Sequence, residues 1–361
     1  MPDRIGGRSG VSPWLATLLL AVTGLALSGC RRSASWPSYQ GYLRSALQST
    51  GRIADHTAGE RTTSEGQAYA LFFALVSNDR THFDQILRWT EDNLAGGDLS
   101  AQLPAWSWGR AADGSWRILD ANPASDADLW MAYTLLEAGR LWHNPRYTSL
   151  GTALADQIAR QEVILIPALG ATLLSGPHGF HPYPDTWLLN PSYMPPQLIA
   201  GLASYDPQGP WGAVLSSVPV VVAQGSANGF AMDWVSAGAS VAPAPAPAQF
   251  ATGNVAAPAY GSYDAIRVYL WLGTADPETP GVHEALSSLT GMSDYLQHHP
   301  LPPERVDDAG NIVAADSPVG FSAAVLPYLE AVGLQAEEKA QADRLQQQRD
   351  PGTGLWGSRA A

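Results

Sequence analysis

The sequence predicts an all-α domain with long loops. Apolar residues recur at helical spacing along most of the chain, as in Tyr69–Val76 and Leu129–Leu136, and Gly, Pro or Asn separates one such segment from the next. Alternating β-branched patterns are scarce, and only Val163–Ile166 and Val218–Val222 could form short strands. With 361 residues, of which 45% are hydrophobic, the chain can bury a sizeable core.

The expected helices follow one another along the chain with Pro- and Gly-rich spacers between them. About twelve helices would fit in the chain at this spacing. Ser236–Pro258 alternates Ala and Pro, which favours extended conformations, and we expect a long surface loop there rather than a linker between domains. Besides the two segments above, the helical patterns cover Phe83–Leu94, Tyr147–Ile158, Leu198–Ser204, Tyr263–Leu272, Glu284–His298, Phe321–Val332 and Ala336–Gln348.

The composition excludes some partners and favours others. The formal charge is −13 and no block of Lys or Arg occurs, so nucleic acids and polyanionic polysaccharides are poor candidates as ligands. There are 13 tryptophans beside 13 tyrosines, and flat aromatic rings are the surfaces on which sugar rings stack. We expect no cofactor and no metal, since no phosphate-binding Gly loop occurs and His178 and His181 lack further ligands of suitable spacing.

The amino terminus has the pattern of a lipoprotein signal. A basic start precedes the apolar segment Trp14–Leu27, which is too short for a mature membrane span. Leu-Ser-Gly-Cys then ends at Cys30, the only cysteine of the chain, and resembles the bacterial lipobox. The resemblance implies that residues 1–29 are removed, that Cys30 is lipidated, and that residues 30–35 form a tether. Because Arg31 follows, we expect an outer-membrane lipoprotein facing the periplasm; the alternative is an ordinary secretory signal with a chance cysteine.

Three acidic residues begin apolar helices. Glu65 stands in TTSEGQAYA, Asp126 in ASDADLW and Asp264 in GSYDAIRVYLW. In a barrel of alternating inner and outer helices, the inner helices all run the same way and open on one rim. The three carboxylates would therefore converge in a single cleft, as the cleavage of a glycosidic bond requires.

Helix capping is the simpler interpretation of the same acids. Ser64 with Gln67, and Ser125 with Asp128, have the spacing of capping boxes, and acids favour helix amino termini. For any one acid alone, capping would be preferred. It does not, however, require the three acids to meet.

Four segments resemble the motifs of glycoside hydrolase family 8. Ala124–Trp142 is similar to the family signature, with one departure at Thr134, and Ser64–Tyr69 is similar to the motif of the catalytic acid. Asn190–Tyr193 and Tyr263–Arg267 resemble the two later motifs, and the resemblance extends from about Trp36 to the end of the chain. The residues of these segments are most similar to those of endoglucanases from bacterial cellulose-synthesis operons. The resemblance implies one catalytic domain over residues 36–361, an (α/α)6 barrel, and inverting hydrolysis of β-1,4-glucan.

The resemblance also implies a role for each site residue. Glu65 would be the general acid and Asp264 the general base, and Asp126 would bind and distort the sugar at the cleavage point. Tyr193 would hold the attacking water, and Arg267 would keep the base ionised. An inverting enzyme places its two working carboxyl groups roughly 6.5–9.5 Å apart.

Aromatic residues are the candidates for glucose subsites. Trp106, Trp108, Trp116 and Trp187 fall in predicted loops, whereas Trp130 and Tyr69 lie on the helices of Asp126 and Glu65. Ordinary packing is the alternative for each of them. The expected partners are cellulose chains, and a cellulose synthase or export complex is a further candidate.

Other activities remain open from the residues alone. Within the family the substrate could instead be xylan, chitosan or mixed-linkage glucan. Outside it, the chain could be a non-hydrolytic glucan-binding lipoprotein, although binding needs neither Glu65 nor Asp264. A polysaccharide lyase would need a basic cluster, which is absent.

Overall fold

The computed structural model describes residues 36–167, 169–247 and 259–350. Residues 38–350 belong to one compact unit with one main hydrophobic core. The expected signal segment, Cys30 and the tether lie outside the described residues. Among the residues that are described, no helix is both long and apolar enough to cross a membrane.

Twelve α-helices occur in the described residues, as the apolar periodicity predicted. In chain order, the helices are α2 (Pro37–Ala46), α3 (Ser64–Val76), α4 (Arg80–Leu94), α5 (Ser125–Trp142), α6 (Pro145–Gln161), α7 (Pro196–Tyr205), α8 (Trp211–Gly225), α9 (Ala265–Thr274), α10 (Val282–Ser288), α11 (Thr290–Leu296), α12 (Val319–Ala331) and α13 (Gln335–Gln348).

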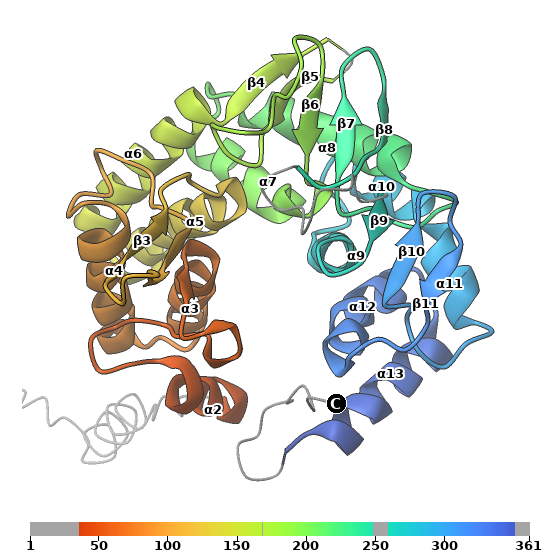
Figure 1. The fold of residues 1–361 in the computed structure, drawn as a ribbon, viewed down its shortest axis with the longest axis horizontal. Helices are drawn as coiled ribbons and strands as arrows, with labels where there is room; N and C mark the ends of the chain where they lie inside the picture. Colours follow the sequence, from red (N-terminus) through yellow and green to blue (C-terminus); the bar gives the residue numbers. More distant parts are fainter. Residues whose placement is uncertain (1–35, 168, 248–258, 351–361) are drawn as a thin grey trace, which may run out of the picture. The chain divides into compact units, whose positions relative to one another are not determined.

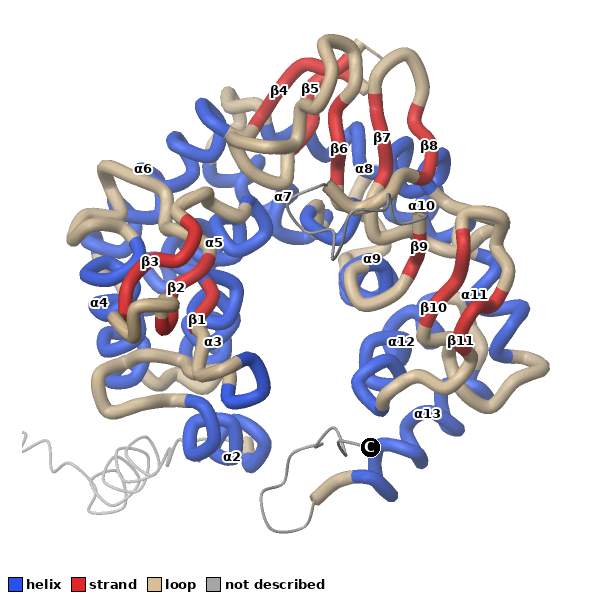
Figure 2. The backbone as a smooth tube through the Cα atoms, in the orientation of Figure 1, coloured by secondary structure: helices blue, strands red, loops and turns tan. Residues whose placement is uncertain are grey.

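The helices from α3 onward form an inner and an outer layer (Figures 1 and 2). Helices α3, α5, α7, α9 and α12 pack against one another in that order, and α4, α6, α8, α10 and α13 pack outside them. The sequences explain the two layers. Helices α3 and α12 are apolar on nearly every face, whereas α4 and α6 are amphipathic. The expected (α/α)6 architecture is confirmed.

The strands are short and form four small antiparallel sheets. Their orders are β1-β2-β3, β4-β5, β6-β7-β8 and β11-β10-β9. The strands are β1 (Thr62–Thr63), β2 (Ser107–Arg110), β3 (Trp116–Asp120), β4 (Val163–Ile166), β5 (Gly170–Leu173), β6 (Trp187–Leu189), β7 (Val235–Ala237), β8 (Val241–Pro243), β9 (Tyr260–Gly261), β10 (Arg305–Asp307) and β11 (Ile312–Ala314).

Three of these sheets lie where the inner helices begin. Strand β1 runs directly into α3, β6 leads through the short 3-10 turn Pro191–Tyr193 into α7, and β9 precedes α9. The sheets therefore brace the amino-terminal ends of the inner helices, the ends that carry the acidic residues.

Several local predictions need correction. The segment Val218–Val222 is not a strand but lies inside helix α8, where Val218, Val221 and Val222 are buried against the core and packing outweighs the lower helix propensity of valine. Glu284–His298 is not one helix, since Leu289 separates α10 from α11. Helix α2 was not expected. The strand Val163–Ile166 is confirmed as β4.

The long loop predicted at Ser236–Pro258 is partly wrong. Its first residues lie in β7 and β8, which pair as a hairpin beside β6. Residues 248–258 lie outside the described residues. Three of the four tryptophans expected in loops lie in strands instead, Trp108 in β2, Trp116 at the start of β3 and Trp187 in β6, and only Trp106 is in a loop.

Candidate active site

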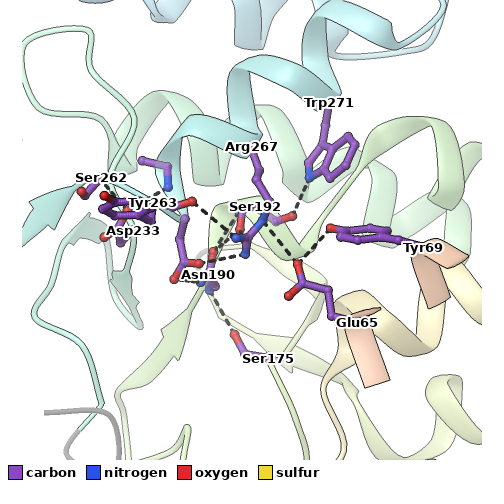
Figure 3. A network of polar contacts seen from close by, with 12 residues as sticks. Glu65, Tyr69, Ser175, Asn190, Ser192, Asp233, Ser262, Tyr263, Arg267 and Trp271 are labelled. Atoms are coloured by element: carbon purple, nitrogen blue, oxygen red, sulfur yellow. Dashed lines mark hydrogen bonds and ion pairs between the residues drawn. The ribbon is translucent and has the colours of Figure 1, made fainter. Parts of the chain in front are cut away.

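The amino-terminal ends of α3 and α9 bring Glu65 and Asp264 to one guanidinium group. Arg267 Nη2 lies 2.8 Å from Asp264 Oδ1, and Arg267 Nε lies 4.0 Å from Glu65 Oε1 (Figure 3). Both carboxyl groups are partly exposed, with 35% of the Glu65 side chain and 30% of the Asp264 side chain accessible. Two acids almost two hundred positions apart in the chain thus face the same cation and remain open to solvent.

The carboxyl group of Glu65 has an aromatic setting. The Tyr69 hydroxyl donates a hydrogen bond of 3.0 Å to Glu65 Oε1. Burial, and then the negative charge of Glu65, raise the pKa of Tyr69 well above its usual value, so this hydroxyl stays a donor. The Tyr69 ring packs edge-on against Trp130, with ring centres 5.7 Å apart, and lies tilted against Trp271 at 6.3 Å.

The carboxyl group of Asp264 has a polar setting. Oδ1 accepts the bond from Arg267, and Oδ2 accepts a bond of 2.9 Å from Asn190 Nδ2. The same guanidinium also donates to Ser192 Oγ at 3.0 Å. These contacts orient both oxygens of Asp264. Asn190 was noted in the sequence only as part of a motif, because nothing in its neighbourhood along the chain indicates a contact with residue 264.

Asp126 lies deeper than the other two acids. It is only 3% exposed, and its Oδ1 has no hydrogen-bond partner among the described residues. Burial, and then the negative charge of Glu65, raise the pKa of Asp126 well above its usual value. Tyr193 lies in the field of the same acids: burial, followed by Asp126 and Asp264, raises the pKa of its hydroxyl. The structure therefore gathers all five residues predicted for the reaction.

Serine side chains connect the helix starts. The backbone N–H of Ser125, at the start of α5, donates to the carbonyl of Ser175 at 3.2 Å. The hydroxyl of Ser175 in turn accepts from the backbone N–H of Asn190 at 3.2 Å (Figure 3). The start of α5, which carries Asp126, is thereby connected through Ser175 to Asn190, which holds Asp264.

The capping boxes predicted for α3 and α5 are wrong. The N-cap of α3 is Thr63, whose hydroxyl accepts from the N–H of Gly66 at 3.1 Å. Gln67 bonds instead to the backbone N–H of Ile53 at 2.7 Å, and the hydroxyl of Ser64 has no partner among the described residues. Glu65 is therefore not needed to cap its own helix.

The start of α5 has no side-chain cap at all. Its N-cap residue is Ala124, and Asp128 turns into the interior, where it faces Glu162. Both residues are 0% exposed, and no N–H in the described part of the chain donates to either carboxyl group. Burial, then the charge of Glu162, raise the pKa of Asp128, and burial also raises that of Glu162. We interpret the pair as a protonated Asp128 that donates a hydrogen bond to Glu162.

The aromatic candidates fall into two groups. Trp130 and Trp187 are buried, at 5% and 8% exposure, and Trp187 stacks on His181 with ring centres 4.7 Å apart. Trp108 stacks on Trp116 at 5.2 Å, and the latter is 45% exposed. Trp116 in the second group therefore has much accessible surface, whereas the rings of the first group have little.

Arginines accompany the tryptophans of the β1-β2-β3 sheet. The guanidinium of Arg52 lies 5.0 Å from the ring centre of Trp108 and 4.9 Å from that of Trp116. That of Arg61 lies 5.4 Å from the ring centre of Trp106. Such cation–π contacts hold these rings in place.

A cavity of about 630 Å³ opens beside the start of α5. Neither Glu65 nor Asp264 lines it. Its walls come from the turn before α5, the segment after β5 and the end of α6, and they are largely polar: Gln102, Asp120, Asn122, Gln161 and His178 are among them.

The two histidines considered as metal ligands serve other contacts. His181 Nε2 lies 3.0 Å from the carbonyl of Pro184, and the carbonyl of His178 accepts from Asn122 Nδ2 at 2.9 Å. Within the described residues, no group of three or more His, Cys, Asp or Glu side chains could hold a metal ion.

Comparisons with known proteins agree on one family. The family model described as glycosyl hydrolases family 8 matches residues 14–345. An endoglucanase of Xanthomonas axonopodis pv. citri is 44% identical over 93% of this chain and 85% of the relative. An endoglucanase of Escherichia coli K12 is 38% identical over 92% of this chain and 85% of the relative.

Solved structures share the fold. The endo-1,4-D-glucanase from Vibrio fischeri ES114 superposes with a TM-score of 0.76 at 39% identity, covering 86% of this chain and 89% of that one. The endo-β-1,4-glucanase CMCax from Acetobacter xylinum superposes with a TM-score of 0.67 at 24% identity, covering 81% and 87%.

Proposed function

The chain belongs to glycosyl hydrolases family 8, and from that premise we propose that it is an inverting endo-β-1,4-glucanase with Glu65 as acid and Asp264 as base. One observation carries the assignment of the two residues. Arg267 contacts both carboxyl groups, which come from different inner helices. A separation of roughly 6.5–9.5 Å, as an inverting mechanism needs, fits two groups that share one guanidinium.

The reaction divides between the two ends of the site. Glu65 gives its proton to the glycosidic oxygen, so that the leaving chain departs as an alcohol. Asp264 takes a proton from a water molecule, whose oxygen bonds to the anomeric carbon from the opposite face. The Arg267 guanidinium holds Asp264 by a charge-assisted hydrogen bond, and the Tyr69 hydroxyl orients Glu65.

Asp126 and Tyr193 complete the catalytic centre. A buried carboxyl group with an unsatisfied oxygen is suited to accept a hydrogen bond from a sugar hydroxyl, and we assign Asp126 to that role. Tyr193, whose phenol lies in the field of both Asp126 and Asp264, would hold the attacking water.

The aromatic rings are proposed as subsites according to their exposure. Trp116 and Trp108 present a stacked pair with open surface, and Trp106 lies in the loop before them. Trp130, Tyr69 and Trp187 would contact glucose by their edges or would shape the walls around it. Flat rings suit a neutral glucan, whose C–H faces pack on them.

The substrate is assigned through relatives rather than through the fold. A family 8 xylanase and a β-1,3-1,4-glucanase share the fold at 18% and 16% identity, so fold alone does not select the polymer. The curated relatives at 35–44% identity are endoglucanases. Activity on carboxymethyl-cellulose that exceeds activity on xylan, chitosan and mixed-linkage glucan would support cellulose as the substrate.

We also propose that the enzyme trims nascent cellulose at the periplasmic side of the outer membrane, anchored by lipid at Cys30. The support is the Leu-Ser-Gly-Cys segment and the similarity to endoglucanases of cellulose-synthesis operons. A Cys30→Ala variant is expected to move from the membrane fraction to the soluble fraction. Co-purification of the lipidated protein with a cellulose synthase complex would identify that partner.

Conservative replacements of the two acids test the mechanism. Glu65→Gln and Asp264→Asn should each lower kcat on cellohexaose by about 10²–10⁴-fold while oligosaccharide binding and Tm stay near those of the parent. Glu330→Gln, an exposed position near the opposite end of the inner helix α12, is the matched control and should leave kcat unchanged.

The stereochemistry of the product is an independent readout. Proton NMR during early turnover should show the α-anomer, because inversion converts the β-linkage. Initial formation of the β-anomer would contradict the inverting assignment. If the parent protein binds cello-oligosaccharides without releasing reducing ends, the glucan-binding alternative is correct.

A further inference from the structure

The first turn of α9 is capped by a residue from another part of the chain. Asp264 occupies the N-cap position, but its side chain makes no capping hydrogen bond. Asp233 Oδ1 instead accepts from the backbone N–H of Ala265 at 2.8 Å and from that of Ser262 at 2.7 Å (Figure 3). The two amides stand on either side of Asp264 in the sequence.

Asp233 is itself held firmly. It lies between α8 and β7, flanked by Met232 and Trp234, which are 1% and 6% exposed. Its own N–H donates to the carbonyl of Tyr260 at 2.7 Å. Burial, and then the charge of Asp264, raise the pKa of Asp233 to about 6, so near pH 7 most molecules carry a carboxylate there, a strong acceptor.

The turn that carries Asp264 is also fixed from its other side. The hydroxyl of Ser262 donates to the carbonyl of Glu304 at 2.7 Å, and the Tyr263 hydroxyl donates to Glu304 Oε1 at 3.1 Å. Among the described residues, Asp233 is the hydrogen-bond partner of the amide of Ala265, which is the first residue of α9. The backbone of the turn is thus clamped between two segments.

The backbone of Asp264 is already helical (φ −81°, ψ −49°), so this residue lacks the extended conformation from which an N-cap side chain accepts from its own first turn. The oxygen that accepts from the Ala265 and Ser262 amides comes from Asp233 instead. We propose that Asp233 is a positioning residue, which caps α9 and fixes the turn on both sides of Asp264, so that both oxygens of Asp264 meet Asn190, Arg267 and the attacking water. The inference rests on the proposed role of Asp264 as base.

Three variants measured on cellohexaose test the proposal. Asp233→Ala removes the acceptor and should lower kcat by about 10- to 100-fold with KM within about twofold, because a small misplacement of a reacting group is costly. Asp233→Asn keeps an amide oxygen at the same place and should retain kcat within about fivefold. Asp79→Ala removes the N-cap of the outer helix α4 and should leave kcat unchanged.

The outcomes separate a positioning role from a structural one. Unchanged kcat in Asp233→Ala, or equal loss in Asp233→Asn and Asp233→Ala, would overturn the proposal. If Asp233→Ala does not fold, Asp233→Ser takes its place. The serine side chain is too short for its hydroxyl to reach both amides, so a kcat equal to that of the parent would again contradict the proposal.

A double variant distinguishes this proposal from the proposed function. If Asp264→Asn retains turnover, the assignment of the base fails, whatever the behaviour at position 233. If Asp264→Asn retains only the residual turnover expected above, adding Asp233→Ala to it should cause no further loss of kcat, because the two residues act on one step. A further loss of tenfold or more would show that Asp233 acts independently of Asp264, and the inference alone would fail.

Discussion

The amino-terminal ends of α3 and α9 solve the same structural problem in different ways. Each must satisfy its first backbone amides and also present a carboxyl group to the substrate. Helix α3 is capped by Thr63, two residues before Glu65, whereas α9 is capped by Asp233, which lies 32 residues from the amide it accepts. In both, the capping oxygen comes from another residue, and the functional carboxyl group is free to face Arg267.

The surroundings of the two acids differ as well. Glu65 has an aromatic neighbour as hydrogen-bond donor and lies 4.0 Å from Arg267, whereas Asp264 is bonded directly by Arg267 and Asn190. Glu65 is thus oriented by a neutral donor, whereas both oxygens of Asp264 are held by donors, one of which is charged. Both acids lie at the start of an inner helix, and their hydrogen-bond partners, rather than this position, distinguish the two roles.

Removal of the shared cation should have the largest effect. Arg267→Met leaves Asp264 without its ion pair and should lower kcat by about 10²–10⁴-fold, with a loss of about 1.5–3 kcal/mol in the free energy of unfolding. Steady-state kinetics and urea denaturation measure the two quantities. The base end should suffer more, since Arg267 bonds Asp264 and only approaches Glu65.

A surface pair of the same spacing is the control for that change. Arg140 pairs with Glu137 three residues earlier on α5 and is largely exposed. Arg140→Met should leave kcat and Tm close to the parental values. Equal destabilisation by the two replacements would contradict a special role for Arg267.

Loss of the local cap should have a smaller effect. Thr63→Ala removes the acceptor for the Gly66 amide and should lower the free energy of unfolding by about 1 kcal/mol, and Thr63→Ser should restore it. Because Glu65 is oriented by Tyr69 and not by the cap, kcat should fall by no more than about threefold. A kcat loss as large as that of Asp233→Ala would erase the difference between α3 and α9.

The third helix start, α5, extends the comparison to stability. Burial raises the pKa of Asp128, so the native protein binds more protons than the unfolded chain above the usual carboxyl range, and this group makes stability fall as pH rises. Asp128→Asn does not titrate and still donates to Glu162. The Tm of the variant minus the Tm of the parent should therefore increase as the pH rises from about 4 to about 8.

Asp79 provides a control of opposite sign. Although burial raises its pKa, hydrogen bonds from His82 outweigh it and hold the pKa of Asp79 below the usual value. Its contribution to stability is therefore present at neutral pH and lost on acidification. The Tm of Asp79→Asn should fall relative to the parent as pH rises, and parallel trends in both variants would contradict the assigned shifts.

Much of the site could be predicted from local sequence. Helix positions followed from the apolar periodicity, and Glu65, Asp126 and Asp264 were identified because each begins an apolar helix. The errors at the helix starts were of one kind. Capping boxes were predicted at Ser64 and Ser125 because their spacing is correct, yet Gln67 and Asp128 are drawn into the interior by partners that lie elsewhere in the chain.

The sequence by itself determined which residues carry charge at the helix starts and which helices are apolar enough to lie inside, because helix periodicity and burial depend on near neighbours along the chain. Tertiary structure alone decided which donor meets which carboxylate. Asn190, Arg267 and Asp233 reach Asp264 or its turn across 74, 3 and 32 positions, and only the Arg267 contact lies within one helical turn. Hydrogen bonds act over about 3 Å in space, whatever the separation in sequence.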